Sequence, residues 1–298
     1  MPLFRKQINI SKRIASARVY ISGLGYYELY INDKKIGDHM LDPGFTAYKK
    51  QALYVTYDIT AALKNSRNII GVMLGNGWWN ALPIRLFGRF NLRDAQQTGR
   101  PCVKAQVLIH YTDGTDETIS TDENWQTVTG PVIRNNVYLG EEYDARLEKK
   151  FADNTGWKNA SIAKGPNGAL TAQMQPAIKV TKVLKPVSIK EVGRDTFIVD
   201  MGQNFAGVAR IKVSGKAGNT VSLRYGEELY PDGSLNYMTS VAGQIKEIWN
   251  LSGGPGCPKT AWQEDHYILK GKGIEEWHSH FSFHGFRYVQ VTGWPGKP

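Results

Sequence analysis

An alternation of apolar and polar side chains with a period of two runs through residues 21–80 and returns until the end of the chain. Successive side chains of a β-strand point to opposite faces, so this alternation predicts strands with one buried face. Helical spacing is nearly absent, and we expect one short helical turn, at residues 59–63 after the capping residue Asp58. Short strands separated by Gly, Asn and Asp turns predict an all-β fold of two sandwich domains.

Two tight turns identify hairpins. Asn32-Asp33 separates an expected strand at 26–31 from one at 34–37, and Thr112-Asp113-Gly114-Thr115 separates 103–111 from 117–121. The remaining expected strands are residues 17–21, 53–57, 68–74, 138–146, 197–200, 207–213, 220–225, 277–283 and 287–292.

Composition limits the class of protein. Apolar residues make up 41% of the 298 residues, which favours a folded chain over a disordered one. No run of eighteen apolar residues occurs, so we expect no membrane-spanning segment. The net charge of +10 comes from scattered pairs such as Lys34-Lys35 and Lys149-Lys150, without a block or stripe, so we expect no nucleic-acid partner.

The amino-terminal residues and the cysteines bear on the cellular compartment of the protein. Residues 1–6 reach polar side chains at once, so no signal peptide is seen, and both a cytoplasmic location and export to a periplasm or the medium stay open. Cys102 and Cys257 fall in different expected domains, which predicts two buried free thiols rather than a disulfide framework.

A change in composition divides the chain. The stretch ASIAKGPNGALTAQMQP, at residues 160–176, is small, polar and rich in Gly and Pro, as inter-domain connections are. We therefore predict a first domain at 1–168 and a second at 169–298.

The motifs on either side of this connection resemble the β-domains of bacterial α-L-rhamnosidases. In the first half they are SGLGYYELYINDKKIGD, LDPGFTAY, VTYDIT, IGVMLGNGWWN and GEEYDAR; in the second half they are DMGQNFAGVARI, YGEELYPDGSL, YILKGKG and FHGFRYVQVTG. The resemblance implies a jelly-roll-like β-sandwich followed by a concanavalin-like one.

The same resemblance implies what the chain does. The family carries its hydrolytic carboxylates on an α/α-barrel that follows these domains, and the sequence stops at 293–298, where that barrel would begin. We therefore expect no catalytic residue here. The expected role is to scaffold that barrel of the same polypeptide and to hold rhamnose-containing glycans. The alternative is a stand-alone, lectin-like carbohydrate-binding protein.

Trp78, Trp79 and Asn80 are the first candidate carbohydrate-binding residues. Sugars stack on indole rings and hydrogen-bond to amides, and the glycines at 75 and 77 let the backbone turn sharply. Adjacent strand residues face opposite ways, so one tryptophan would belong to the core. Packing or a domain interface is the alternative role for this loop.

Glu142, Asp144 and Arg146 are the second set of candidate carbohydrate-binding residues. Alternation places them on one face of a strand, with Glu141 beside them. They could satisfy sugar hydroxyls or Ca²⁺, while a plain salt bridge is the alternative. We predict no cofactor and no metal ligand, with Ca²⁺ at this segment as the one possibility kept open.

Other polar groups have ordinary interpretations. His278, His280 and His284, with His266 upstream, show a possible metal spacing, but a surface or contact role is favoured. Glu227-Glu228 and Glu264-Asp265 are expected to be solvated, because adjacent carboxylates do not provide the separation that a glycosidase pair needs.

Overall fold

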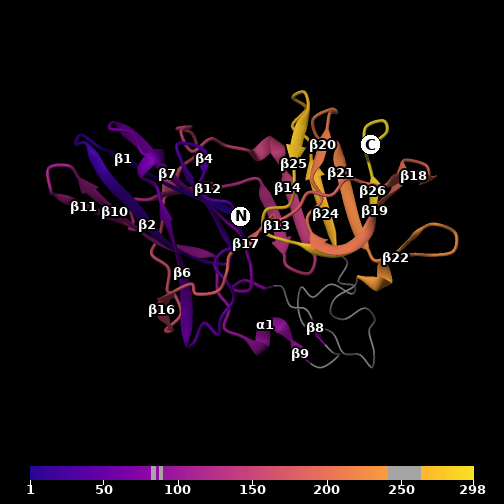
Figure 1. Ribbon diagram of the computed structural model, residues 1–298, viewed down its shortest axis with the longest axis horizontal. Coiled ribbons are helices and arrows are strands. Elements are labelled where there is room, and N and C mark those ends of the chain that lie inside the picture. Colours follow the sequence, from indigo (N-terminus) through magenta and orange to yellow (C-terminus); the bar gives the residue numbers. More distant parts are fainter. Residues whose placement is uncertain (82–84, 87–89, 241–262) are drawn as a thin grey trace. The chain divides into compact units, whose positions relative to one another are not determined.

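The computed structural model describes residues 1–81, 85–86, 90–240 and 263–298. These residues form two compact units, and the chain passes between them several times (Figure 1). The first unit contains Met1–Asn80, Gln97–Gly130 and Lys149–Lys179, and the second contains Ala81–Gln96, Pro131–Glu148 and Val180–Pro298. The all-β prediction is confirmed, with β-strands as the dominant element of both units.

The first unit is built from two sheets. The six-stranded sheet has the order β15 (Lys158–Asn159), β12 (Gln126–Thr129), β1 (Pro2–Asn9), β7 (Arg67–Leu74), β3 (Tyr27–Ile31) and β4 (Lys34–Lys35). The five-stranded sheet has the order β11 (Asp116–Ser120), β10 (Cys102–Tyr111), β2 (Ile14–Leu24), β6 (Gln51–Asp58) and β16 (Ala169–Ala172). A short ribbon pairs β5 (His39–Met40) with β17 (Ile178–Lys179).

One core holds these two sheets together. Leu29 of β3 and Val72 of β7 belong to the same buried cluster as Val19 of β2 and Val107 of β10. Their strands come from different sheets, so the inward faces of the sheets pack on each other as in a β-sandwich.

The local turns follow the sequence prediction. Asn32 and Asp33 join β3 to β4 with φ of 53° and 63°, the left-handed pair that a two-residue hairpin loop requires. The expected helical turn is the 3₁₀-helix η1 (Thr60–Ala62), and Asp58 Oδ1 accepts a hydrogen bond from Thr60 N at 2.9 Å.

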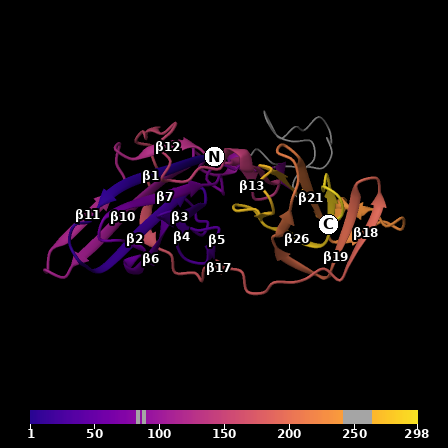
Figure 2. The same cartoon turned by 90° about the horizontal axis from the view of Figure 1, so that it is seen from above.

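The second unit is organised by a seven-stranded sheet. Its order is β13 (Val132–Asn136), β14 (Gly140–Asp144), β24 (Glu264–Ile268), β21 (Thr220–Gly226), β26 (His284–Thr292), β19 (Thr196–Gly207) and β18 (Ser188–Gly193). Figure 2 shows β18 beside β19 at one edge of this sheet. Three two-stranded ribbons are β20 (Ile211–Val213) with β25 (Glu275–Trp277), β22 (Glu228–Leu229) with β23 (Leu235–Asn236), and β8 (Arg85–Leu86) with β9 (Phe90–Asn91).

Ribbon β20–β25 packs on the large sheet through aromatic rings. Trp277 of β25 stacks on Tyr267 of β24 with ring centroids 5.2 Å apart. The short helices of this unit are α1 (Leu92–Ala95), η2 (Ala145–Leu147) and η3 (Tyr237–Thr239).

Three strand predictions in this unit need correction. The strand predicted at 138–146 is limited to β14, and Arg146 lies in η2, because the Asp144 side chain accepts a hydrogen bond from Arg146 N and caps that helix. The strand predicted at 277–283 stops with β25 at Trp277, because the backbone N–H groups of His280 and Phe281 bond to the Glu141 side chain instead of a neighbouring strand. The strand predicted at 207–213 is divided between the end of β19 and β20.

The domain boundary at 168/169 stays a prediction. Residues 131–148 belong to the second unit, because β14 pairs in parallel with β24, with Glu142 opposite His266. No helix in the described part of the chain is long and apolar enough to cross a membrane. Cys102 is half-buried with a free thiol, and Cys257 lies outside the described residues.

Candidate functional site

Trp79 is a core residue of the first unit. Its side chain is 3% exposed, its Nε1 donates to the carbonyl of Arg100 at 2.8 Å, and its ring meets Tyr48 edge-on at 5.1 Å. A fully engaged indole of this kind stabilises the loop rather than presenting a face to a ligand.

Trp78, the preceding residue, is half-buried and packs against Phe45. Their ring centroids lie 5.1 Å apart, and Phe45 is 50% exposed. We call Trp78 and Phe45 the aromatic surface. Asn80 lies near it in sequence, and its Nδ2 donates to Asn76 Oδ1 at 2.7 Å. The sequence analysis missed Phe45, although an aromatic residue in the Pro-Gly turn of LDPGFTAY is a usable signal.

Asp144 and Arg146 form an ion pair in the second unit. Arg146 donates from Nε to Asp144 Oδ1 at 2.9 Å and from Nη2 to Oδ2 at 2.7 Å, a bidentate geometry. The Arg146 hydrogen bonds hold the pKa of the Asp144 carboxyl below its usual range. Glu142 is half-buried, with Arg134 Nε at 3.7 Å from its Oε2. Both oxygens of Asp144 are thus already engaged.

The candidate residues are divided between the two units. Trp78, Trp79 and Asn80 belong to the first unit, whereas Glu142, Asp144 and Arg146 belong to the second. Each set is therefore described within its own unit.

A buried polar network occupies the second unit. Asp265, with 0% exposure, accepts hydrogen bonds from Glu141 N at 2.7 Å and Tyr225 Oη at 2.7 Å, and its Oδ2 lies 3.1 Å from His284 Nε2. The prediction that Asp265 is solvated is wrong, because β24 lies inside the seven-stranded sheet and turns this side chain inward.

The histidines do not gather into a metal site. His284 is buried in this network, and His266 Nδ1 contacts Ser222 Oγ at 2.8 Å. Across the described ranges, no group of three or more His, Cys, Asp or Glu side chains is arranged to hold a metal ion.

Two family models match the chain. The model of the α-L-rhamnosidase N-terminal domain covers residues 12–182, and that of the bacterial α-L-rhamnosidase concanavalin-like domain covers residues 190–298. The resemblance seen in the sequence motifs is thereby confirmed, and with it the concanavalin-like second domain.

Named relatives agree with the family models. The chain is 37% identical to an α-L-rhamnosidase of Formosa agariphila over 99% of this chain and 30% of that protein. It is 34% identical to an α-L-rhamnosidase of Streptomyces avermitilis over 96% of this chain and 26% of that protein.

Solved structures show the same fold. The α-L-rhamnosidase of Dictyoglumus thermophilum superposes with a TM-score of 0.86 at 40% identity, over 100% of this chain and 31% of that one. The Streptomyces avermitilis enzyme complexed with L-rhamnose superposes with a TM-score of 0.85 at 32% identity, over 100% of this chain and 27% of that one. The chain therefore spans about 30% of the length of the relatives it matches.

Proposed function

The chain belongs to the α-L-rhamnosidase family, and from this premise we propose that it is the non-catalytic β portion of such an enzyme. The observation that carries the proposal is the coverage: both family β-domain models match in order, while the chain accounts for only 30% of the Formosa agariphila relative. Its role is to scaffold the hydrolytic part of the polypeptide and to hold rhamnose-containing glycans near it.

The chemistry of the described carboxylates supports a non-catalytic role. Glycoside hydrolysis needs an acid and a base carboxyl group about 5–9.5 Å apart across the scissile bond. The buried Glu141 and Asp265 are instead engaged by backbone and side-chain donors of their own unit. Glu275, also buried, accepts hydrogen bonds from Tyr267 Oη at 2.8 Å and Lys270 N at 3.0 Å. These three groups thus serve as internal acceptors for the fold.

The aromatic surface is the proposed contact for glycan in the first unit. Phe45 is 50% exposed and Trp78 lies beside it, a pair of aromatic rings that suits contact with the C–H face of a sugar. Asn80 supplies an amide on the same loop. Trp79 is assigned to support of that loop, while Glu142, Asp144 and Arg146 rank below it because their charges are largely paired with each other and with Arg134.

Calorimetric titration of the full chain with methyl α-L-rhamnoside tests this contact. Stacking with two or three hydrogen bonds predicts a dissociation constant between about a millimolar and tens of micromolar. Trp78→Ala and Phe45→Ala should each weaken binding by tenfold or more. If both folded variants bind like the wild type, the aromatic surface is structural and the glycan contact proposed here is wrong.

A further inference from the structure

The apolar face of the seven-stranded sheet is left open at its β18 edge. Tyr225 of β21 lies opposite Val289 of β26, and Val289 lies opposite Val199 of β19. Val199 in turn lies opposite Ile189 of β18, so the four side chains form a row on one face of the sheet. Along this row Tyr225 is 0% exposed, Val289 3% and Ile189 44%, with Val199 half-buried between the last two. The interior of the second unit therefore reaches solvent at β18, the edge strand in Figure 2.

The segment before β18 adds further exposed valines. Val187 precedes Ile189 by two residues, and its N–H donates to Asp200 O at 2.8 Å, which continues the pairing with β19. Alternation places the side chain of Val187, which is 67% exposed, on the same face as Ile189. Val180 and Val183 are also exposed. We call Val180, Val183, Val187 and Ile189 the apolar edge, and such a gathering of exposed aliphatic side chains is typical of a protein–protein contact.

The strand itself is protected against pairing with another strand. β18 follows Pro186 and carries Lys190 and Glu191, and every one of its side chains after Ser188 is exposed. Charged residues and proline at a sheet edge oppose the addition of a further strand. A partner therefore packs on the side chains of the apolar edge rather than extending the sheet.

Lysines alternate with the apolar residues of this segment. Lys182, Lys185 and Lys190 are exposed and have no ion-pair partner within the described residues, whereas Glu191 is paired with Lys297 Nζ at 3.3 Å. A surface complementary to this segment presents apolar side chains to the valines and carboxylates to the lysines.

We propose that the apolar edge is the docking surface for the hydrolytic part of the same polypeptide, on a face that combines apolar side chains with carboxylates. The Dictyoglumus thermophilum α-L-rhamnosidase superposes on 100% of this chain, which accounts for only 31% of that protein. A covalently attached partner acts at a high effective concentration, an advantage that a second copy of this chain does not have. The inference rests on the proposed function, which places this chain in an enzyme of that kind.

Hydrogen–deuterium exchange followed by mass spectrometry tests the docking. The samples are this chain alone and a chimera in which it replaces the matching 31% of the Dictyoglumus thermophilum enzyme. Peptides that span residues 180–193 should exchange about tenfold more slowly, or slower still, in the chimera, because a docked partner removes the apolar edge from water. Equal exchange in the two samples would overturn the proposal. If the chimera does not fold, protection of the aligned residues in the unaltered Dictyoglumus thermophilum enzyme decides by the same criterion.

Substitutions on the apolar edge separate docking from folding. Val187→Lys and Ile189→Lys change exposed side chains, so neither should alter the urea unfolding of the chain alone, whereas each should restore fast exchange in the chimera. Val183→Lys, which lies outside any strand, replaces them if they unfold the second unit. The matched control is Ile274→Lys, an exposed aliphatic residue of the same unit outside the apolar edge, and it should leave the chimera protected. Protection that survives in the apolar-edge variants would refute the docking surface.

Charge reversal tests the chemistry of the partner. The double variant Lys182→Glu, Lys185→Glu should lose several-fold of the protection seen in the chimera, because two carboxylates would then face those of the partner. Unchanged protection would overturn the assignment of a partner face that carries carboxylates.

Two further measurements keep the alternatives apart. Sedimentation of the chain alone should show a monomer, and a dimer that Ile189→Lys dissociates would assign the apolar edge to a second copy and overturn the proposal. Equal exchange together with a chain that does not hydrolyse rhamnosides refutes the docking surface alone. Hydrolysis of rhamnosides by the chain alone refutes the proposed function.

Discussion

Oε2 of Glu141 accepts a hydrogen bond from the backbone N–H of Phe281 at 2.9 Å, across 140 residues of sequence. Oε1 of the same carboxyl group accepts from His280 N at 3.0 Å, and Glu141 is 1% exposed. One buried side chain therefore takes the place of a strand partner for the loop between β25 and β26. Buried backbone donors must be satisfied, so this contact fixes where β25 ends.

Glu141→Gln should destabilise the second unit. A glutamine offers one acceptor oxygen and turns its NH₂ group toward the other backbone N–H, which leaves a buried donor unpaired at a cost of about 2 kcal/mol. Urea unfolding at pH 5 measures the loss. The matched control is Glu142→Gln, since Glu142 is half-buried with its Arg134 contact at 3.7 Å, and its stability should stay within about 0.5 kcal/mol of the wild type. Equal stability of the two variants would contradict the assigned role.

The stability difference between the wild type and Glu141→Gln should shrink as pH rises. Desolvation raises the pKa of the Glu141 carboxyl from 4.5 to about 7, with Asp265 adding to the rise and His280 opposing it. A raised folded-state pKa adds stability that is complete below pH 4.5 and lost as pH rises through 7. The shift corresponds to roughly 3 kcal/mol of stability in the wild type, whereas the glutamine side chain does not titrate and adds no such pH dependence.

Urea titrations between pH 4.5 and 8 measure this difference. The pKa of Asp265 is lowered, so its proton-linked effect falls below this range. Glu142→Gln keeps the Glu141 carboxyl, so the stability loss that this carboxyl causes as pH rises should persist in that variant. A gap that widens with pH would mean that the folded state favours the charged form of Glu141.

Local features of this fold can be predicted from the sequence, whereas strand pairings between distant segments cannot. Asn32-Asp33 predicts its hairpin because Asn and Asp readily adopt the left-handed conformation that a two-residue loop requires. No residue close to Glu142 in sequence predicts that its strand, β14, pairs in parallel with β24, where His266 lies opposite Glu142. For the same reason, the alternating pattern predicts a strand that continues past Trp277. The side chain that ends the strand, Glu141, is remote in sequence and gives no local signal.

Trp79→Ala should destabilise the first unit far more than Trp78→Ala. Removing a buried tryptophan costs about 3–5 kcal/mol, and Trp79 also donates its Nε1 hydrogen to Arg100 O. Trp78 is half-buried beside the partly exposed Phe45, so its loss should cost roughly 1 kcal/mol. Thermal unfolding followed by circular dichroism compares the two, and similar melting temperatures would contradict the core assignment of Trp79.

Gly25→Ala should destabilise the first unit by displacing the loop at residues 75–80, which carries Trp78 and Trp79. Gly25 has φ of +101°, and a Cβ there would lie 2.1 Å from the carbonyl oxygen of Gly75. Gly114, with φ of +83° and no atom within 4 Å of an added Cβ, is the matched control for backbone strain alone. Gly114→Ala should cost about 1 kcal/mol and Gly25→Ala at least twice that in urea unfolding. Equal losses of unfolding free energy in the two variants would show that the backbone at Gly75 can move aside for the added methyl group.

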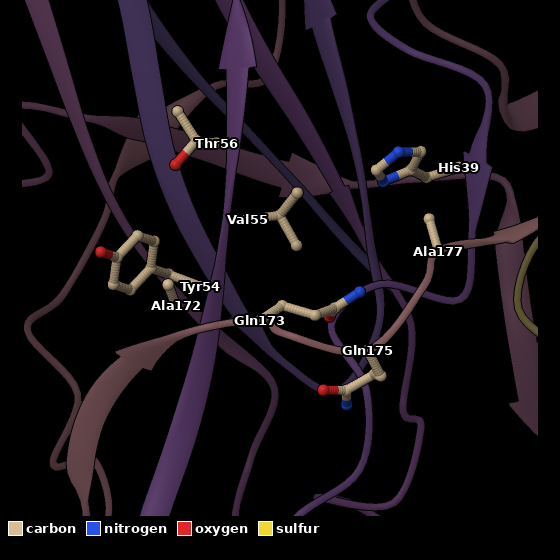
Figure 3. Close-up of a pocket in the computed structure, with 8 residues that line it drawn as sticks. All are labelled: His39, Tyr54, Val55, Thr56, Ala172, Gln173, Gln175 and Ala177. Carbon is tan, nitrogen blue, oxygen red and sulfur yellow. The ribbon is translucent and has the colours of Figure 1, made fainter.

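The candidate site shows the same division between local and distant information. The sequence GNGWW predicts a loop that carries two aromatic side chains, and alternation predicts that one of the two tryptophans is buried. Which one is buried depends on contacts with Tyr48 and Arg100, which are distant in sequence. A shallow hollow beside β6 (Figure 3) leaves no motif in the sequence, because His39, Thr56 and Gln175, which line it, come from three segments that the pairing of β16 with β6 and of β17 with β5 brings together.

Hydrolysis of 4-nitrophenyl α-L-rhamnoside by the purified chain tests the central claim most directly. The positive control is an equimolar amount of a full-length relative such as the Formosa agariphila α-L-rhamnosidase. The non-catalytic assignment predicts that this chain releases nitrophenol no faster than buffer does. Release at a rate typical of enzymes, about 1 s⁻¹ or more, would contradict it.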